Sequence, residues 1–254
     1  MHVERVRFSM LWAARHAVVS LLVALGSAAL VFGLWYPMPY RAMQGVGSIY
    51  LLILVVDVVC GPLLTLVMAT PKKSRRELFF DLGIIGLIQV AALLYGMHAV
   101  WIARPVVLAF ESDRLVVVTA NEIDKSGLSK APEGLRQLKN TGVLEVATRQ
   151  HRSNAELLEG IDRSMAGDSP AMRPDWWEPM SQHLNEMRAK ARPLSELTAR
   201  KPQHADLLKG AAVKTGTEST LLWYLPLTSS RTKDWIALLD AQMKVVGYAQ
   251  VDGF

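Results

Sequence analysis

Hydrophobic residues are distributed unevenly along this chain of 254 residues. The first 103 residues hold three apolar windows, each near the roughly 20 helical residues that cross about 30 Å of hydrocarbon. They are Ala17–Trp35, Ile49–Ala69 and Leu78–Ala103. The remaining residues alternate polar and apolar positions over shorter stretches. The pattern predicts a membrane domain with three transmembrane helices over residues 1–103 and a second domain over residues 104–254.

The first window has the basic residues before it that a cleaved signal peptide also carries. At about 19 residues it is longer than a signal-peptide core of roughly 7 to 15, and the bulky sequence WYPMPY follows it instead of small residues. We therefore interpret it as a retained membrane anchor.

Basic residues flank two of the segments between the windows. The head carries Arg5, Arg7 and Arg15, the second connection carries PKKSRRE, and the first connection has Arg41 alone. Because basic flanks stay on the cytoplasmic side, the amino terminus is predicted to be cytoplasmic and residues after Ala103 external. In a bacterium this is a multi-pass inner-membrane protein with a periplasmic carboxyl-terminal domain. Asp81, near the basic connection, is predicted to form an ion pair with it.

The second domain begins with strand patterns and ends with them. Two β-branched runs, 106–110 and 115–120, flank a polar ESDR and predict a hairpin, and the less regular alternation at 143–150 predicts a third strand. Helical patterns follow at 153–167, from Pro179 to before Pro193, and at 204–216. Residues 219–227 and 234–252 return to strands, the latter with a DAQM turn. An α+β domain is predicted, with a partly antiparallel sheet, about three helices and its boundary at Arg104-Pro105.

Charge supports the same division. The chain is 51% apolar and 20% charged, with a net charge of +5. Residues 104–254 hold 20 Lys and Arg against 19 Asp and Glu, so the excess comes from the membrane half. The basic balance therefore indicates membrane topology and contact with anionic lipids, with no nucleic-acid partner. The single cysteine, Cys60, lies in the second window and leaves the external domain without a disulfide.

Motifs that carry chemistry are not found in the external sequence. Its histidines, His151, His183 and His204, lie in three separate segments, and no HExxH, GxSxG, Walker A or dinucleotide-binding pattern is present. We expect no metal, no cofactor and no enzymatic activity.

The second window contains an unusual stretch, VVDVVCGPLL. An ionisable residue at mid-bilayer is costly and normally faces the interior of a bundle with a partner. By residue counting, Asp57 and Gln89 of the third window lie at nearly the same depth, which predicts a hydrogen bond between them. Gly61 and Pro62 predict a kink one turn further on. These four residues form the candidate intramembrane site.

Aromatic and arginine residues provide a candidate interface. Trp176 and Trp177, near Arg173, are either a binding platform or an apolar cap under which the preceding loop packs. Trp35, Tyr36 and Tyr40 are typical of an interfacial belt that closes the first helix, and they could also present a surface. Arg104 belongs to the junction between the two domains.

Several motifs in order resemble the TfpX/TfpZ family of type IV pilin accessory proteins. They are WYPMPY, VDVVCGPLLTLV, PKKSRRELFFDL, GLIQVAALLYG, ARPVVLAFESDRLVVV, RPDWW and ARPLSEL, and together they extend over essentially the whole chain. The resemblance implies an inner-membrane protein that binds type IV pilin as a chaperone or assembly accessory and has no catalytic residues. Its oligomeric state stays open.

Two alternatives remain. A periplasmic sensor is one, although about 16 residues at the head and about seven in the loop leave little in the cytoplasm for signalling without a partner. A membrane-bound transferase acting on pilin is the other, and it would need clustered acids or a metal site at the outer face.

Overall fold

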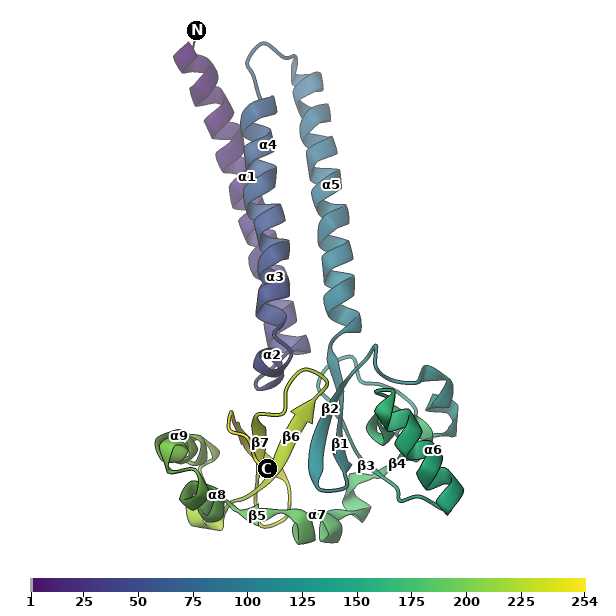
Figure 1. Ribbon diagram of the computed structural model, residues 1–254. Coiled ribbons are helices and arrows are strands. Elements are labelled where there is room, and N and C mark those ends of the chain that lie inside the picture. The colour runs from purple at the N-terminus through teal and green to yellow at the C-terminus, as the bar shows by residue number, and fades with distance from the viewer. Residues whose placement is uncertain (1) are drawn as a thin grey trace. The chain divides into compact units, whose positions relative to one another are not determined.

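The computed structural model describes residues 2–254, with the backbone alone described at His2. The chain divides into two compact units, one reaching Arg104 and the other running from Pro105 to Phe254 (Figure 1).

The first unit is helical. Three helices, Val3–Trp35, Val46–Met68 and Arg75–Ile102, are long and apolar enough to cross a membrane. Two of them contain π-helical turns, in which each N–H bonds to the carbonyl five residues back. The elements are α1 (His2–Leu30), η1 (Val31–Trp35), α2 (Tyr40–Met43), α3 (Val46–Leu54), η2 (Val55–Cys60), α4 (Gly61–Met68) and α5 (Arg75–Ile102).

The helices extend beyond the apolar windows. The first begins at His2, because the basic head continues the helix on the amino-terminal side of the predicted window. The third begins with a capping box in which Ser74 Oγ accepts from the Glu77 backbone N–H and Ser74 N–H donates to the Glu77 carboxylate. Lys73 Nζ lies 2.6 Å from an Asp81 oxygen, which confirms the predicted ion pair.

The second unit is a mixed sheet with helices, which confirms the predicted α+β class. Its strand order is β4-β3-β1-β2-β6-β7-β8, and β5 also pairs with β6. The β1·β3 and β2·β6 pairs are parallel and the others antiparallel. The strands are β1 (Pro105–Glu111), β2 (Arg114–Thr119), β3 (Leu144–Thr148), β4 (Trp177–Pro179), β5 (Arg192–Pro193), β6 (Trp223–Ser229), β7 (Trp235–Leu239) and β8 (Val245–Ala249).

Two apolar cores stabilise this unit. One joins β1, β2 and β3 to the loops around Trp177, and the other packs β6, β7 and β8 against two helices. The longer helices are α6 (Asn154–Met165), α7 (Leu184–Lys190), α8 (Leu194–Arg200) and α9 (Ala205–Thr215). Single 3₁₀ turns complete the chain: η3 (Lys125–Lys130), η4 (Pro170–Met172), η5 (Pro174–Trp176), η6 (Met180–Gln182), η7 (Pro202–His204) and η8 (Ser219–Leu221).

The predicted hairpins are confirmed, and one helix start is wrong. The predicted helix from Pro179 begins instead at Leu184, because residues up to Pro179 pair with β3 as strand β4. At the DAQM turn, Asp240 takes the place of the usual Asn-Gly signal. Its carboxylate accepts from the backbone N–H groups of Gln242 and Lys244, and Met243 adopts φ 63°.

Candidate functional site

A cluster of polar side chains joins the three membrane-length helices. Gln89 on α5 is at its centre: its Oε1 lies 2.7 Å from His16 Nε2 on α1, and its Nε2 donates to the backbone carbonyl of Asp57 at 2.7 Å. His16 Nδ1 lies 2.6 Å from Thr65 Oγ1 on α4. We call His16, Asp57, Thr65 and Gln89 the polar cluster.

The hydrogen bonds of the cluster form a directed chain. The amide nitrogen of Gln89 must face the Asp57 carbonyl, because a carbonyl can only accept. The Gln89 oxygen therefore faces His16, so Nε2 of His16 carries the proton. In the neutral imidazole Nδ1 then accepts from the hydroxyl of Thr65, which is fully buried. Each bond connects two different helices and fixes their register.

The interaction of Gln89 with Asp57 differs from the prediction. The sequence predicted a partnership between the two residues, and Gln89 does reach Asp57, but at the main-chain carbonyl. The π-helical turn Val55–Cys60 explains this. With bonds from residue i+5 to residue i, the Asp57 carbonyl would need the N–H of residue 62, and Pro62 has none. Gln89 supplies the missing donor from a neighbouring helix.

Gly61 is what allows Gln89 to approach so closely. A Cβ at this position would lie 2.2 Å from Gln89 Nε2 and 2.4 Å from its Cδ, far inside van der Waals contact. Any larger residue would displace the Gln89 amide from its two partners. Gly61 and Pro62 thus act together: the proline leaves a carbonyl without an intrahelical donor, and the glycine gives the new donor access to it.

The Asp57 carboxylate is not used within the cluster. The residue is 7% exposed, and its Oδ1 has no hydrogen-bond partner among residues 2–254. It lies beside a cavity of about 120 Å³. Residues from α1, η2 and α5 line this cavity: His16, Val19, Ser20, Val23, Asp57, Gly86, Gln89, Val90 and Leu93.

The aromatic residues at the end of α1 lie between helices. Tyr36 is 1% exposed, and its hydroxyl donates to the Val100 carbonyl of α5 at 2.9 Å. Tyr40 is also buried, and the Trp35 ring lies 4.8 Å from that of Trp101. Of the residues predicted as a belt, the two tyrosines therefore pack inside the unit.

Arg104 lies close to the same aromatic residues. Its guanidinium stacks 3.4 Å from the centre of the Trp101 ring and donates to the Trp101 carbonyl at 2.8 Å. This cation–π contact orders the last residue of the first unit.

The paired tryptophans of the second unit are buried. Trp177 is 2% exposed and its Nε1–H donates to the Ala171 carbonyl at 2.9 Å. Trp176 is 4% exposed, and the guanidinium carbons of Arg149 and Arg173 each lie 4.2 Å from the centre of its ring. Burial lowers the pKa of the Arg173 guanidinium, and the charge of Arg163 lowers it further. These positions fit the packing interpretation of the two indoles.

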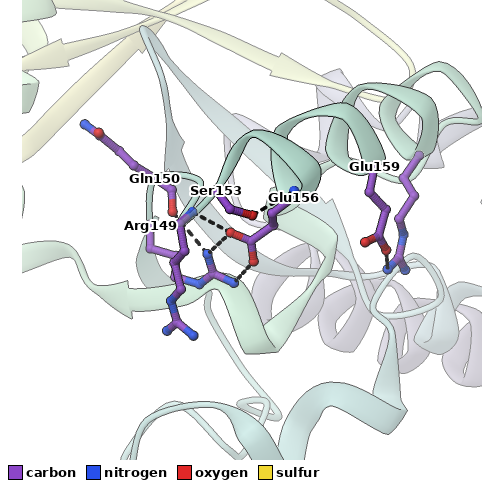
Figure 2. A network of polar contacts seen from close by, with 7 residues as sticks. Arg149, Gln150, Ser153, Glu156 and Glu159 are labelled. Carbon is purple, nitrogen blue, oxygen red and sulfur yellow. Dashed lines mark hydrogen bonds and ion pairs between the residues drawn. The ribbon is translucent and has the colours of Figure 1, made fainter.

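Helix α6 is fixed at its amino end by a charged network (Figure 2). Arg149 donates to both oxygens of Glu156, at 2.6 and 3.0 Å, and the backbone N–H of Arg152 donates to the same carboxylate at 2.5 Å. Ser153 caps the helix by accepting from the Glu156 N–H at 3.1 Å. This network orients α6 relative to the end of β3.

The apolar stripe of α6 faces solvent to a large extent. Leu157, Leu158, Ile161 and Met165 are 39, 65, 47 and 84% exposed. Beneath the helix a broad, open cavity of about 870 Å³ extends to residues following β3 and to α7. The sequence predicted the helix from this stripe but not that the stripe would lack a partner within the second unit.

The network around Glu156 predicts a dependence of stability on pH. The hydrogen bonds from Arg149, followed by that from Arg152, lower the Glu156 pKa from 4.5 to about 2. Because the ionised form is favoured in the folded state, its contribution is complete above pH 4.5 and is lost as the pH falls towards 2. Glu156→Gln should therefore reduce the acid sensitivity of the thermal midpoint of the full chain in detergent, measured between these limits.

Glu159→Gln is the matched control, because it removes a carboxylate from the same helix without removing the Arg149 contact. An equally steep loss of stability in the wild type and in Glu156→Gln would contradict the assignment.

Two members of the polar cluster were missed from the sequence. His16 lies one residue before the first apolar window, and Thr65 is an inconspicuous residue in the second. Thr65 is four residues from Gly61 and eight from Asp57, so a depth count of the second window would have found it. Counting from the first window instead puts His16 at the edge of the span, and only the extension of α1 back to His2 brings it level with Gln89. Among residues 2–254, no three His, Cys, Asp or Glu side chains are grouped as a metal site.

Comparison with known proteins points to one family. Residues 4–45 match the family model described as fimbrial assembly protein FimB. The chain is 33% identical over 258 residues to the serogroup E1 fimbrial assembly protein of Dichelobacter nodosus, which covers 100% of this chain and 99% of that relative. The serogroup I protein of the same organism is also 33% identical, over 256 residues and the same shares. No solved structure gives a significant match.

Proposed function

The chain belongs to the fimbrial assembly protein family, and from this premise we propose that it aids pilus assembly by binding type IV pilin. The narrower assignment, a pilin accessory protein of the TfpX/TfpZ type that acts as a chaperone without catalysis, is part of the proposal. A pilin awaiting assembly has an apolar membrane helix and a soluble head.

The observation that carries the proposal is the arrangement of this chain in two units. The membrane-length helix α5 ends at Ile102, and β1 of the second unit begins at Pro105. The chain thus offers a helical surface for a client's membrane segment and, two residues later, a folded domain for its head.

We further propose that the amino terminus is cytoplasmic and the second unit periplasmic. The hydrogen bond of 2.7 Å from Ser9 Oγ to the Ala69 carbonyl supports this, because it joins the basic head to the residues before the basic loop. Both positive segments therefore belong to the same end of the helical unit, the end that the distribution of basic residues assigns to the cytoplasm.

Deleting the gene tests the proposed function. We expect fewer surface pili and reduced twitching motility, with both restored by the gene supplied in trans. Pili should be counted by electron microscopy and pilin measured in membrane and surface fractions. Unchanged piliation and motility in the deletion strain would refute the proposal.

The exposed face of α6 is the surface we propose for contact with the pilin head. A contiguous apolar patch rimmed by charged residues is typical of an interaction site. Leu158→Glu or Met165→Glu should weaken co-purification of pilin by about 5- to 30-fold, which corresponds to an interface contribution of about 1–2 kcal/mol. Because both side chains are largely exposed, the thermal midpoint should change little.

Val213→Glu on α9 is the matched control, since this valine is 78% exposed and lies on a different helix. Equal recovery of pilin with the α6 variants and with this control would exclude α6 as the contact surface.

A further inference from the structure

The cavity beside Asp57 is bounded by the two outer helices of the first unit. α1 and α5 each pack against the continuous middle helix formed by α3, η2 and α4 (Figure 1). Residues of α1 and α5 form the two walls of the cavity, and Asp57 of the middle helix also lines it. The positions 16–23 on α1 and 86–93 on α5 extend for about two helical turns, roughly 10 Å along each axis.

Several of the side chains that line the cavity are short and exposed. Val23 on α1 and Val90 on α5 are 46 and 53% exposed. A Cβ added to Gly86 would meet nothing within 4 Å. Short side chains on facing helices let another helix backbone approach closely, as is typical of transmembrane helix packing. At about 120 Å³ the cavity has room for a single side chain, presented by another helix that packs against α1 and α5.

One oxygen beside the cavity, Asp57 Oδ1, has no hydrogen-bond donor among residues 2–254. The Gln89 oxygen faces His16, one of its two amide N–H groups donates to the Asp57 carbonyl, and both ring nitrogens of His16 have partners. Neither the second amide N–H of Gln89 nor the hydroxyl of Ser20 is hydrogen-bonded to Asp57 Oδ1. The Oδ1 of Asp57 is the acceptor that remains without a partner among residues 2–254, and it is enclosed in a segment of membrane length. A polar atom left in hydrocarbon without a partner is costly, so an occupant that donates to Asp57 is strongly favoured.

We propose that this cavity docks a transmembrane helix of the pilin client, with a hydrogen-bond donor at mid-membrane depth placed against the Asp57 carboxylate. The inference rests on the proposed function and names the membrane part of the interface. A lipid acyl chain could fill the cavity but has no donor. A second copy of this chain in a two-fold arrangement would bring carboxylate against carboxylate, so it satisfies Asp57 poorly.

Photo-crosslinking in cells that express epitope-tagged pilin tests the inference. Benzoylphenylalanine is placed at Val90 and Val23 in the walls, and at Leu87 on α5 and Leu22 on α1 as matched controls. These leucines are 70 and 64% exposed and do not line the cavity. We expect adducts of pilin with the wall positions at about tenfold the yield from the control positions, because proximity decides the yield.

Asp57→Leu should lower the adduct yield at Val90 by about three- to tenfold, the range expected for one interhelical hydrogen bond. Val90→Trp, which fills the cavity and keeps the carboxylate, should lower the yield at Val23 similarly, whereas Leu87→Trp should not. Membrane level and gel-filtration profile in detergent report whether each variant is folded. The Val90→Trp arm tests the inference even if Asp57→Leu misfolds.

Equal yields at wall and control positions would overturn the inference, as would yields that neither Asp57→Leu nor Val90→Trp changes. Adducts to lipid alone, or to a second copy of this chain, would also overturn it. If pilin is crosslinked from probes at Leu158 or Met165 but not from the wall positions, pilin binding stands and docking in the membrane is refuted. Unchanged piliation in the deletion strain refutes the proposed function itself.

Discussion

Replacing Gly61 by alanine should destabilise the helical unit by about 1–3 kcal/mol, through the loss of interhelical hydrogen bonds and overpacking. The new methyl group would occupy the position of the Gln89 amide, whose nearest atom lies 2.2 Å from the place that the Cβ would take. Gln89 would have to leave both the Asp57 carbonyl and His16, so one carbonyl in the membrane segment would lose its donor. The thermal midpoint of the purified full chain in detergent measures the effect.

Gly83→Ala provides the control for this substitution. Gly83 also lies in a membrane-length helix, but a Cβ there meets nothing within 4 Å. Its replacement should be neutral or slightly stabilising, because alanine favours the helix over glycine. If Gly61→Ala and Gly83→Ala have the same thermal midpoint, the close approach of Gln89 to Gly61 does not contribute to the stability of the unit.

The sequence predicted the depth of Asp57 and Gln89 but not the form of their contact. Depth follows from counting residues along straight helices. The contact depends on a π-helical turn, which holds one more residue than an α-helical turn. The donor for the Asp57 carbonyl would then be residue 62, which is a proline and has no N–H. The spacing of hydrophobic residues along the sequence does not reveal a π-helical turn. Pro62 is evident in the sequence. Because proline has no N–H, its position could have predicted that a carbonyl in the preceding turn lacks a hydrogen-bond donor.

In the second unit, local sequence patterns predicted where strands and helices lie better than they predicted which strands pair. The hairpin of β1 and β2 follows from two β-branched runs, and it is confirmed. Helix α8 was missed although Pro193 precedes it and Leu194 and Leu197 have helical spacing, because seven residues give too short a pattern. The parallel pairing of β2 with β6 joins residues more than 100 positions apart, and neither strand carries a local signal for it.

The exposed stripe of α6 explains why a helical pattern is weak evidence for a core. Leu158 and Met165 have the spacing of a buried face, yet the network of Arg149 and Glu156 holds the helix so that this face remains accessible. Periodicity reports that a face is apolar, and only the tertiary structure decides whether it packs within the chain or remains for a partner. For a protein that binds another, the second outcome is informative about function.

Trp177→Ala should have the largest effect on the second unit, about 3–5 kcal/mol as for other buried aromatic residues cut to alanine. The indole is 2% exposed, packs in the core formed with β1 and β3, and donates to the Ala171 carbonyl. Hydrogen exchange of the full chain in detergent, followed by mass spectrometry, should show amides of β1 and β3 exchanging about 150- to 4,000-fold faster.

Trp177→Phe separates packing from hydrogen bonding. It keeps most of the apolar contact but leaves the Ala171 carbonyl without the Nε1–H donor, so an intermediate loss of about 1–3 kcal/mol is expected. Amides of α4, in the other unit, should exchange at the wild-type rate in both variants and provide an internal control. Wild-type protection of β1 and β3 in Trp177→Ala would mean that this core does not depend on the indole, and Trp177 would again be open to a role in binding.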